Sequence, residues 1–443
     1  MSSAPENRAP REEQAAGDLP HQICRGLSLQ ANALGNLALQ LMAVEEQVAG
    51  LSPSATAGTA AQGGSNGKRN DGVAKAIIEQ FLRLGMGETS DCDAFWEYFI
   101  AALARNLDRV PDDGPGLDLK MRLASYFLRA FLHNFYPGDA ECFYWQAGRL
   151  RQAVFHMAQD QGLNLLPIHF YGPVPDVRAL PQEFWSQPSE WPGIRAHAGK
   201  QIELLASFAS RFRPEYEAIP IEKPEGSPPY QYYAHNTFYD SIDGYILYCM
   251  IRHFRPRRIV EIGSGNTTYL SAETIARNQL DDSTYACELT AIEPHPNEVL
   301  KARFPGLARL IEKPAQQVPL TEFEALEEND ILFIDSSHVL AIGSDVQYEI
   351  LEILPRLKKG VVVHFHDIFT PREYPREWAQ EMNRYWTEQY ILQAFLAFND
   401  SFEVLLSPQY LHTYHPESME AAFSCYHRGQ SWIPAAFWIH RTK

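Results

Sequence analysis

The stretch DILFIDSSHVLAIGSDVQYEILEILPRLKKGVVVHFHD, residues 330–367, decides the fold class of this chain. It begins and ends with near-continuous apolar runs, DILFID (330–335) and GVVVHFHD (360–367), which are typical of strands covered by helices on both faces. Between them, Ser344 with a glutamine three residues later forms a capping box that starts a helix, and Gly360 ends it. The stretch therefore predicts two parallel strands joined by a right-handed helical crossover.

The same alternation of strand-like runs and amphipathic helices extends over residues 238–443. The other runs are RRIVEIG (257–263), LTAIEP (289–294), ARLIEK (308–313), FEVLLS (402–407) and AFWIHR (436–441). Alternating strands and helices indicate the α/β class. We therefore expect a Rossmann-like, doubly wound and mostly parallel sheet.

The chain upstream of this domain changes composition several times. Residues 1–20 are polar and predict a disordered tail, and the glycine-rich residues 52–72 predict a flexible linker. Spaced apolar residues over 73–165 predict an α-helical N-terminal domain. The segment 166–237, rich in proline and aromatic residues, predicts an ordered connector or lid.

Residues 21–51 carry apolar side chains at steps of three and four from Ile23 to Leu51, if Gln30 is counted. This rhythm is compatible with a coiled coil, which would form a homo-oligomer through residues 23–51. The alternative is an amphipathic helix that lies on the protein's own body.

The composition excludes several classes of protein. The chain has 443 residues, 45% of them hydrophobic and 21% charged, which is typical of a globular protein with more than one domain. A formal net charge of −17 argues against a nucleic-acid partner. No apolar stretch reaches the ~18 residues of a membrane helix. Because the polar N-terminus also lacks the apolar segment of a secretory signal, we expect no membrane partner and a cytoplasmic location.

The first strand and the second strand end in residues suited to a nucleoside ligand. Ligands of a doubly wound sheet bind outside the C-terminal ends of its strands. The first strand ends in Glu261-Ile-Gly263-Ser-Gly265, where the glycines permit a tight turn, and Asn266 or Thr267 is expected to cap the following helix. The second strand ends at Glu293, whose carboxylate can accept hydrogen bonds from both ribose hydroxyls.

Titratable side chains gather at the ends of the two strands of the opening stretch. Asp335 and His338 follow one strand, and His366 and Asp367 follow the next. Four titratable groups held close together at one sheet edge reduce the stability of the fold and are typical of functional sites. We therefore interpret them as functional. His364 lies well inside its strand, and we expect it to be a core histidine.

The motifs EIGSGN, AIEPHP, DILFIDSSH and GVVVHFHDIF, in this order and spacing, resemble those of the class I S-adenosylmethionine-dependent methyltransferases. More narrowly, the chain resembles the small-molecule branch found beside bacterial natural-product and polysaccharide genes. The resemblance covers residues 238–443 and implies a seven-stranded sheet that ends in a β-hairpin.

The resemblance also implies the residues that hold S-adenosylmethionine. The glycine turn would face the methionine end, Glu293 the ribose, and the turn after the third strand the adenine. The implied cofactor-binding residues are Glu261, Gly263, Ser264, Gly265, Asn266, Glu293, Ala315, Gln316, Asp335 and Asp243.

Some related sugar O-methyltransferases bind a divalent metal, and this resemblance implies a metal site at Asp335, His366 and Asp367. His366 stands where the family has an acid. Because Mg²⁺ prefers oxygen ligands, this nitrogen donor disfavours Mg²⁺ and opens the site to Mn²⁺, Fe²⁺ or Zn²⁺, so the identity of the metal stays open among these four ions. The implied catalytic residues are His338, as the base, with Asp335 and His366. Tyr374 and Trp378, in the aromatic segment after the fifth strand, are expected either to contact the substrate or to pack in the core.

We therefore expect a methyltransferase that acts on a small molecule, through O-methylation of a sugar or natural-product hydroxyl. One alternative is an NAD(P)-dependent oxidoreductase, which Thr268 in place of a third glycine and the distance to Glu293 disfavour. The other is a non-catalytic protein that binds S-adenosylmethionine and assembles through its N-terminal helix.

Overall fold

The computed structural model describes residues 168–428 and 434–443, with a few isolated residues between 117 and 166. The chain divides into two compact units after Pro175, inside the predicted connector. The predictions for residues 1–20, 21–51 and 52–72, and nearly all of the helical domain predicted over 73–165, lie outside the described residues.

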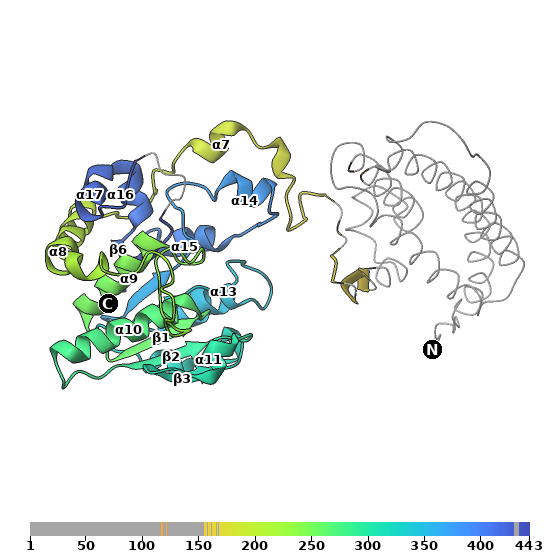
Figure 1. Ribbon diagram of the computed structural model, residues 1–443. Helices are drawn as coiled ribbons and strands as arrows, with labels where there is room; N and C mark the ends of the chain where they lie inside the picture. The colour runs from red at the N-terminus through yellow and green to blue at the C-terminus, as the bar shows by residue number, and fades with distance from the viewer. Residues whose placement is uncertain are drawn as a thin grey trace, which may run out of the picture. The chain divides into compact units, whose positions relative to one another are not determined.

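The second unit is built on a seven-stranded sheet with the order β3-β2-β1-β4-β5-β7-β6 (Figure 1). Strands β1 to β5 pair in parallel, and β7 is antiparallel to both of its neighbours. This arrangement confirms the predicted Rossmann-like, mostly parallel sheet with its antiparallel C-terminal pair. The strands are β1 (Arg258–Ile262), β2 (Glu288–Ile292), β3 (Leu307–Ile311), β4 (Ile331–Ile334), β5 (Val362–Phe365), β6 (Phe402–Leu406) and β7 (Phe437–Arg441).

Helices alternate with the strands along the chain. The longer ones are α8 (Ala198–Tyr216), α9 (Ser241–Phe254), α10 (Asn266–Asp281) and α15 (Glu388–Leu396). The shorter ones are η2 (Val177–Ala179), α7 (Gln182–Ser186), α11 (Glu298–Ala302), η3 (Ala315–Gln317), α12 (Leu320–Glu324), α13 (Asp345–Tyr348), η4 (Glu349–Ile353), η5 (Leu354–Arg356), α14 (Arg376–Gln380), α16 (Pro408–Tyr414) and α17 (Pro416–Ala422).

Two hydrophobic cores lie on the two faces of the sheet. In β4, Ile331 and Phe333 belong to the core shared with α8, α9 and α10, whereas Leu332 and Ile334 belong to the core shared with α12, α13 and α15. Successive side chains of a strand point to opposite faces, so a strand between two helical layers must be apolar throughout. This is why the opening stretch contains continuous apolar runs.

The crossover between β4 and β5 differs in detail from the predicted single helix. The hydroxyl of Ser344 accepts from the backbone N–H of Gln347, as a cap should, but the Gln347 side chain accepts from Gly343 rather than from Ser344. The helix then passes through the π-helical turn η4 and the 3₁₀ turn η5. Gly360 ends the crossover with a φ of +91°.

Among the described residues, no helix is both long enough and apolar enough to cross a bilayer.

Candidate active site

The ends of β1, β2, β4 and β5 meet at one edge of the sheet. Ile262 is in register with Ile292 and with Ile334, and Ile334 is in register with Phe365. The residues that follow these strands therefore stand side by side, as the sequence predicted. They are Gly263, Glu293, Asp335 and His366.

Gly263 occupies a position that no other residue can fill without a shift of the backbone. Its φ is +78°, and a Cβ placed on it would lie 1.7 Å from the backbone oxygen of Asp335. Gly265 differs, because its φ of 176° is extended and nothing lies within 4 Å of its Cβ position. The turn is therefore closed beside Gly263 and open beside Gly265.

Glu261 lies buried beneath this turn, at 1% exposure. Its Oε1 accepts from the hydroxyls of Thr267 (2.5 Å) and Thr268 (3.0 Å), whereas its Oε2 has no hydrogen-bond partner in the described part of the chain. Burial raises the pKa of Glu261 to about 8. A buried carboxylate with one free oxygen is suited to receive a cationic or donor group of a ligand.

The cap of α10 is not the predicted one. Gly265 is the N-cap residue, and its backbone N–H donates to the hydroxyl of Thr268 (3.0 Å). Asn266 and Thr267, which were expected to cap, both lie inside the helix. Thr268 thus fills the place of a third glycine and closes the turn with its side chain.

Glu293 is tied to the same turn. Its Oε2 accepts from the backbone of Ser264 (3.3 Å), and its Oε1 accepts from the backbone of His295 (2.7 Å). The hydroxyl of Ser264 is buried and finds no hydrogen-bond partner among residues 168–428 and 434–443. Ser264 and Glu261 therefore both leave an unpaired polar oxygen at this turn.

The other predicted cofactor residues lie in different environments. Ala315 is buried on η3, and the exposed Gln316 donates to the backbone of Gly343 (3.4 Å). The Asn266 amide donates to the Asn236 side chain (3.2 Å). Asp243 accepts from the backbone N–H groups that precede β7, at 2.9 and 3.1 Å. Asp243 therefore joins α9 to β7.

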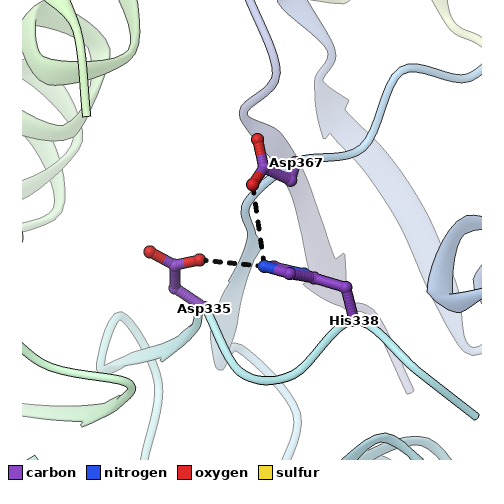
Figure 2. Close-up of side chains that lie close together, drawn as sticks. All are labelled: Asp335, His338 and Asp367. Atoms are coloured by element: carbon purple, nitrogen blue, oxygen red, sulfur yellow. Dashed lines mark ion pairs between the residues drawn. The ribbon is translucent and has the colours of Figure 1, made fainter. Parts of the chain in front are cut away.

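Asp335, His338 and Asp367 converge at the next two strand ends (Figure 2). His338 Nε2 lies 3.4 Å from Asp335 Oδ1 and 3.6 Å from Asp367 Oδ2. One ligand atom from each of the three side chains lies within 4.8 Å of the other two. The group could therefore hold a metal ion.

His366 joins this cluster from the side of β5. Its Nδ1 lies 3.5 Å from Asp335 Oδ1 and 3.8 Å from Asp367 Oδ1, and its ring packs against Tyr239 at 4.6 Å. The structure thus brings together every residue predicted for the catalytic and metal sites. The donor group whose atoms lie within 4.8 Å of one another contains His338, whereas the predicted metal set had His366 in its place.

Opposite charges at close range shift the pKa values of the cluster. Burial alone would lower the pKa of His338, but Asp335 and Glu388 raise it to about 10. Burial would raise the pKa of Asp335, but His366 and His338 hold it well below its usual range. Burial raises the pKa of Asp367. The cluster is thus a strongly coupled set of buried charges.

His364 is a core residue, as expected. It is fully buried between Phe333 and Trp438, and burial holds its pKa well below the usual value.

Sequence reasoning missed two neighbours of His338. Glu388 Oε2 lies 2.8 Å from His338 Nδ1, and the Trp386 ring packs on the imidazole at 4.3 Å. An acid at the first position of a helix is common because it interacts favourably with the helix dipole. The sequence therefore did not indicate that Glu388 contacts His338.

Tyr374 and Trp378 lie in a packed aromatic cluster beside this site. Tyr374 is 5% exposed, and its hydroxyl accepts from the backbone of Gln389 (3.1 Å). Trp378 packs against Trp386 and Phe369, with the Arg384 guanidinium 4.8 Å above its ring. Tyr374 is therefore a core residue in this structure.

Comparison with known proteins identifies a related domain. Residues 260–368 match a family model described as a methyltransferase domain. An uncharacterized protein of Archaeoglobus fulgidus is 33% identical over 183 residues, which make up 39% of this chain and 78% of that protein.

Two solved structures give weaker likenesses. The apo structure of CmcI-N160 has a TM-score of 0.28 at 14% identity and covers 68% of this chain and 99% of that chain. A Plasmodium falciparum chain described as a protein-L-isoaspartate O-methyltransferase, in complex with S-adenosyl-L-homocysteine, has a TM-score of 0.21 at 14% identity and covers 38% and 83%. At such TM-scores these superpositions carry no argument about function.

Proposed function

The chain belongs to the class I S-adenosylmethionine-dependent methyltransferases, and on that premise we propose that it methylates a hydroxyl group of a small molecule with His338 as the general base. The observation that carries the proposal is the position of His338. Its Nε2 faces Asp335 and Asp367, at the sheet edge that also bears the glycine turn.

The glycine turn is the part of the site that would hold the methyl donor. The donor supplies a methyl group on a sulfonium, which is already a good leaving group, so the protein mainly has to align the reactants. The free Oε2 of Glu261 and the free hydroxyl of Ser264 offer acceptors for the polar end of the donor. Glu293, held by two backbone N–H groups, offers its remaining lone pairs to ribose hydroxyls.

His338 is suited to take the proton of the acceptor hydroxyl. The Glu388 carboxyl group and the Trp386 ring hold the imidazole, so that Nε2 stays oriented toward Asp335 and Asp367. An alcohol is a poor nucleophile at neutral pH, and a base within hydrogen-bond reach removes its proton as the new bond forms. Positive charge beside Asp335 and Asp367 would lower the raised pKa of His338 toward its usual range.

Asp335 and Asp367 would hold a divalent metal, with an imidazole nitrogen of His366 as a further donor. Two carboxylates and an imidazole suit Mn²⁺, Fe²⁺ or Zn²⁺ better than Mg²⁺, which prefers oxygen ligands. A metal bound there supplies a Lewis acid that lowers the pKa of a nearby hydroxyl.

The acceptor in this proposal is a sugar or natural-product hydroxyl, encountered in the cytoplasm. Support comes from the acidity of the chain, with a net charge of −17, which disfavours nucleic acid. Support also comes from the paired acids and base at the strand ends, which suit deprotonation of an alcohol.

The test combines a binding measurement with a transfer assay. Calorimetry should detect S-adenosylhomocysteine binding and no NAD(H) binding, and radiolabelled S-adenosylmethionine should label hydroxyl compounds in a panel of sugars and phenols. His338→Ala should lose most turnover and keep S-adenosylhomocysteine binding. Binding of NAD(H) alone would favour an oxidoreductase, and binding without transfer to any panel member or cell extract would favour a non-catalytic protein. Full activity of His338→Ala would remove His338 from the mechanism.

A further inference from the structure

Glu388 makes the closest contact to the imidazole of His338, although the two residues are 50 positions apart in the chain. Glu388 is 1% exposed and His338 is 6% exposed, so water does not compete for this contact. Oε2 of Glu388 lies 2.8 Å from Nδ1, whereas Oε1 is buried and has no hydrogen-bond partner among the described residues. Within the described part of the chain, the imidazole is therefore the hydrogen-bond partner of this carboxyl group, and charge-assisted contacts of this kind are strong in a buried setting.

The chain around Glu388 also holds the backbone of His338. The backbone N–H groups of Thr387 and Glu388 both donate to the carbonyl oxygen of His338, at 2.9 and 3.1 Å. The Thr387 hydroxyl in turn accepts from the backbone of Leu340 (2.7 Å). These contacts hold the start of α15 against the loop that carries His338.

His338 itself has a backbone conformation that needs such support. Its φ is +61°, in the left-handed region that non-glycine residues rarely adopt, at a cost of about 1–3 kcal/mol. Neighbouring residues hold His338 at three points: its carbonyl oxygen, its Nδ1 atom and the face of its ring, where Trp386 packs at 4.3 Å. Only Nε2 is left to face the acids at the strand ends.

We propose that Glu388 is a positioning residue for His338: its carboxylate accepts a hydrogen bond from the N–H of Nδ1 and thereby keeps Nε2 as the atom that meets the acceptor. This inference rests on the proposed function, in which Nε2 is the base. Asp335 and Asp367 lie near Nε2 and attract a proton to that atom. Without Glu388, a neutral imidazole would carry its proton on Nε2 and turn its lone pair away from the site.

The first test needs no acceptor molecule. In the full-length protein labelled with ¹⁵N-histidine, the His338 signals are assigned by their loss in His338→Gln. The wild type should show a proton on Nδ1 in a strong hydrogen bond. In Glu388→Gln the Nδ1 proton signal should move upfield because its hydrogen bond weakens, whereas Glu381→Gln, which changes an exposed acid in the segment before α15, should leave the spectrum unchanged. An unchanged His338 signal in Glu388→Gln would overturn the proposal.

The second test uses the acceptor found in the transfer panel. Glu388→Gln should lower kcat about 10- to 100-fold and leave the KM for S-adenosylmethionine unchanged. In the double variant with His338→Gln, the loss should equal that of His338→Gln alone, because the two residues act as a unit. Losses that multiply would overturn the proposal, since a merely structural role would add to the loss of His338.

Two further measurements separate the sources of failure. If Glu388→Gln does not fold by circular dichroism, Glu388→Asp, which keeps the charge, takes its place and should retain a proton on Nδ1. If S-adenosylhomocysteine binds to neither the wild type nor the variant, the proposed function fails, and the ¹⁵N spectrum still decides whether Glu388 controls the His338 proton.

Discussion

The backbone oxygen of Asp335 fills the space that a side chain at Gly263 would need. The two residues end neighbouring strands, β1 and β4, and a Cβ on Gly263 would approach that oxygen to 1.7 Å. The glycine turn and the acidic cluster are therefore in direct contact, and a change in one should move the other.

Gly263→Ala should lower the free energy of unfolding by about 2–4 kcal/mol, because alanine must adopt a φ of +78° and displace the backbone of Asp335. Urea denaturation of the purified protein measures this loss. Gly265→Ala is the matched control, since its Cβ position is free and its φ is extended. It should keep the stability of the wild type and weaken S-adenosylhomocysteine binding. Equal stability of both alanine variants would contradict the geometry of this turn.

Glu261 should make donor binding depend on pH. In the free protein, burial raises its pKa to about 8, so the group is largely protonated at pH 7. A cationic ligand favours the carboxylate, so binding should release a proton and tighten as pH rises from 6.5 to 8.5. Calorimetry of S-adenosylmethionine binding in two buffers of different ionisation enthalpy measures the number of protons released on binding.

Glu261→Gln provides the control for this dependence. It keeps an oxygen that can accept from Thr267 and Thr268 but cannot ionise. It should bind more weakly, with no proton release near pH 8. The same release in this variant would assign the titration to another group.

A divalent metal should stabilise the protein through Asp335 and Asp367. At a concentration about 100 times its Kd, a ligand that binds only the folded state adds about 2.7 kcal/mol. Differential scanning fluorimetry with Mn²⁺, Mg²⁺ and Zn²⁺ after chelator treatment should show a rise in Tm for the wild type and none for Asp335→Asn. Asp400→Asn, which changes an exposed acid, should respond like the wild type. A rise retained in Asp335→Asn would place the metal elsewhere.

Glu273 should make the stability of the protein depend on pH. Burial raises its pKa to about 7 from 4.5, although its carboxylate accepts from the Tyr232 backbone and the Gln231 side chain. The folded state therefore binds a proton more tightly than the unfolded state. This contribution is fully present below pH 4.5 and is lost as pH rises through 7.

Glu273→Gln should be more stable than the wild type at pH 8 by about 1–3 kcal/mol and similar to it at pH 5, because the amide never charges. Urea denaturation at both pH values measures the difference. Glu298→Gln, at a fully solvated position, should show no such difference. A variant that loses stability at pH 8 would show that the ionised carboxylate is stabilising.

The fold could be predicted because strands, helix starts and helix ends each depend on residues that are close together in the chain. DILFID and GVVVHFHD became β4 and β5 because a strand between two helical layers has to be apolar on both faces. Ser344 and Gly360 marked the crossover because a cap and a left-handed turn need particular residues. The π-helical turn η4 had no such signal, since the side chains over Glu349–Ile353 also suit an ordinary helix.

The candidate site could be predicted only in part. Gly263, Glu293, Asp335 and His366 lie together because parallel strands in register end at one edge. The expectation that Asn266 or Thr267 caps α10 was wrong, since the backbone of Gly265 and the hydroxyl of Thr268 close the turn instead. The aromatic content of the segment after β5 left the role of Tyr374 open, and its burial places it in the core.

The sequence by itself determined the sheet and the residues that follow its strands, because periodic burial and tight turns act on neighbouring residues. The resemblance to the methyltransferases came from the order and spacing of its motifs. Only the tertiary structure decided that Glu388 holds His338, that Asp243 joins α9 to β7 and that His338 approaches both Asp335 and Asp367. Contacts between residues far apart in the chain depend on how helices and loops pack after the sheet has formed, and no local pattern records that packing.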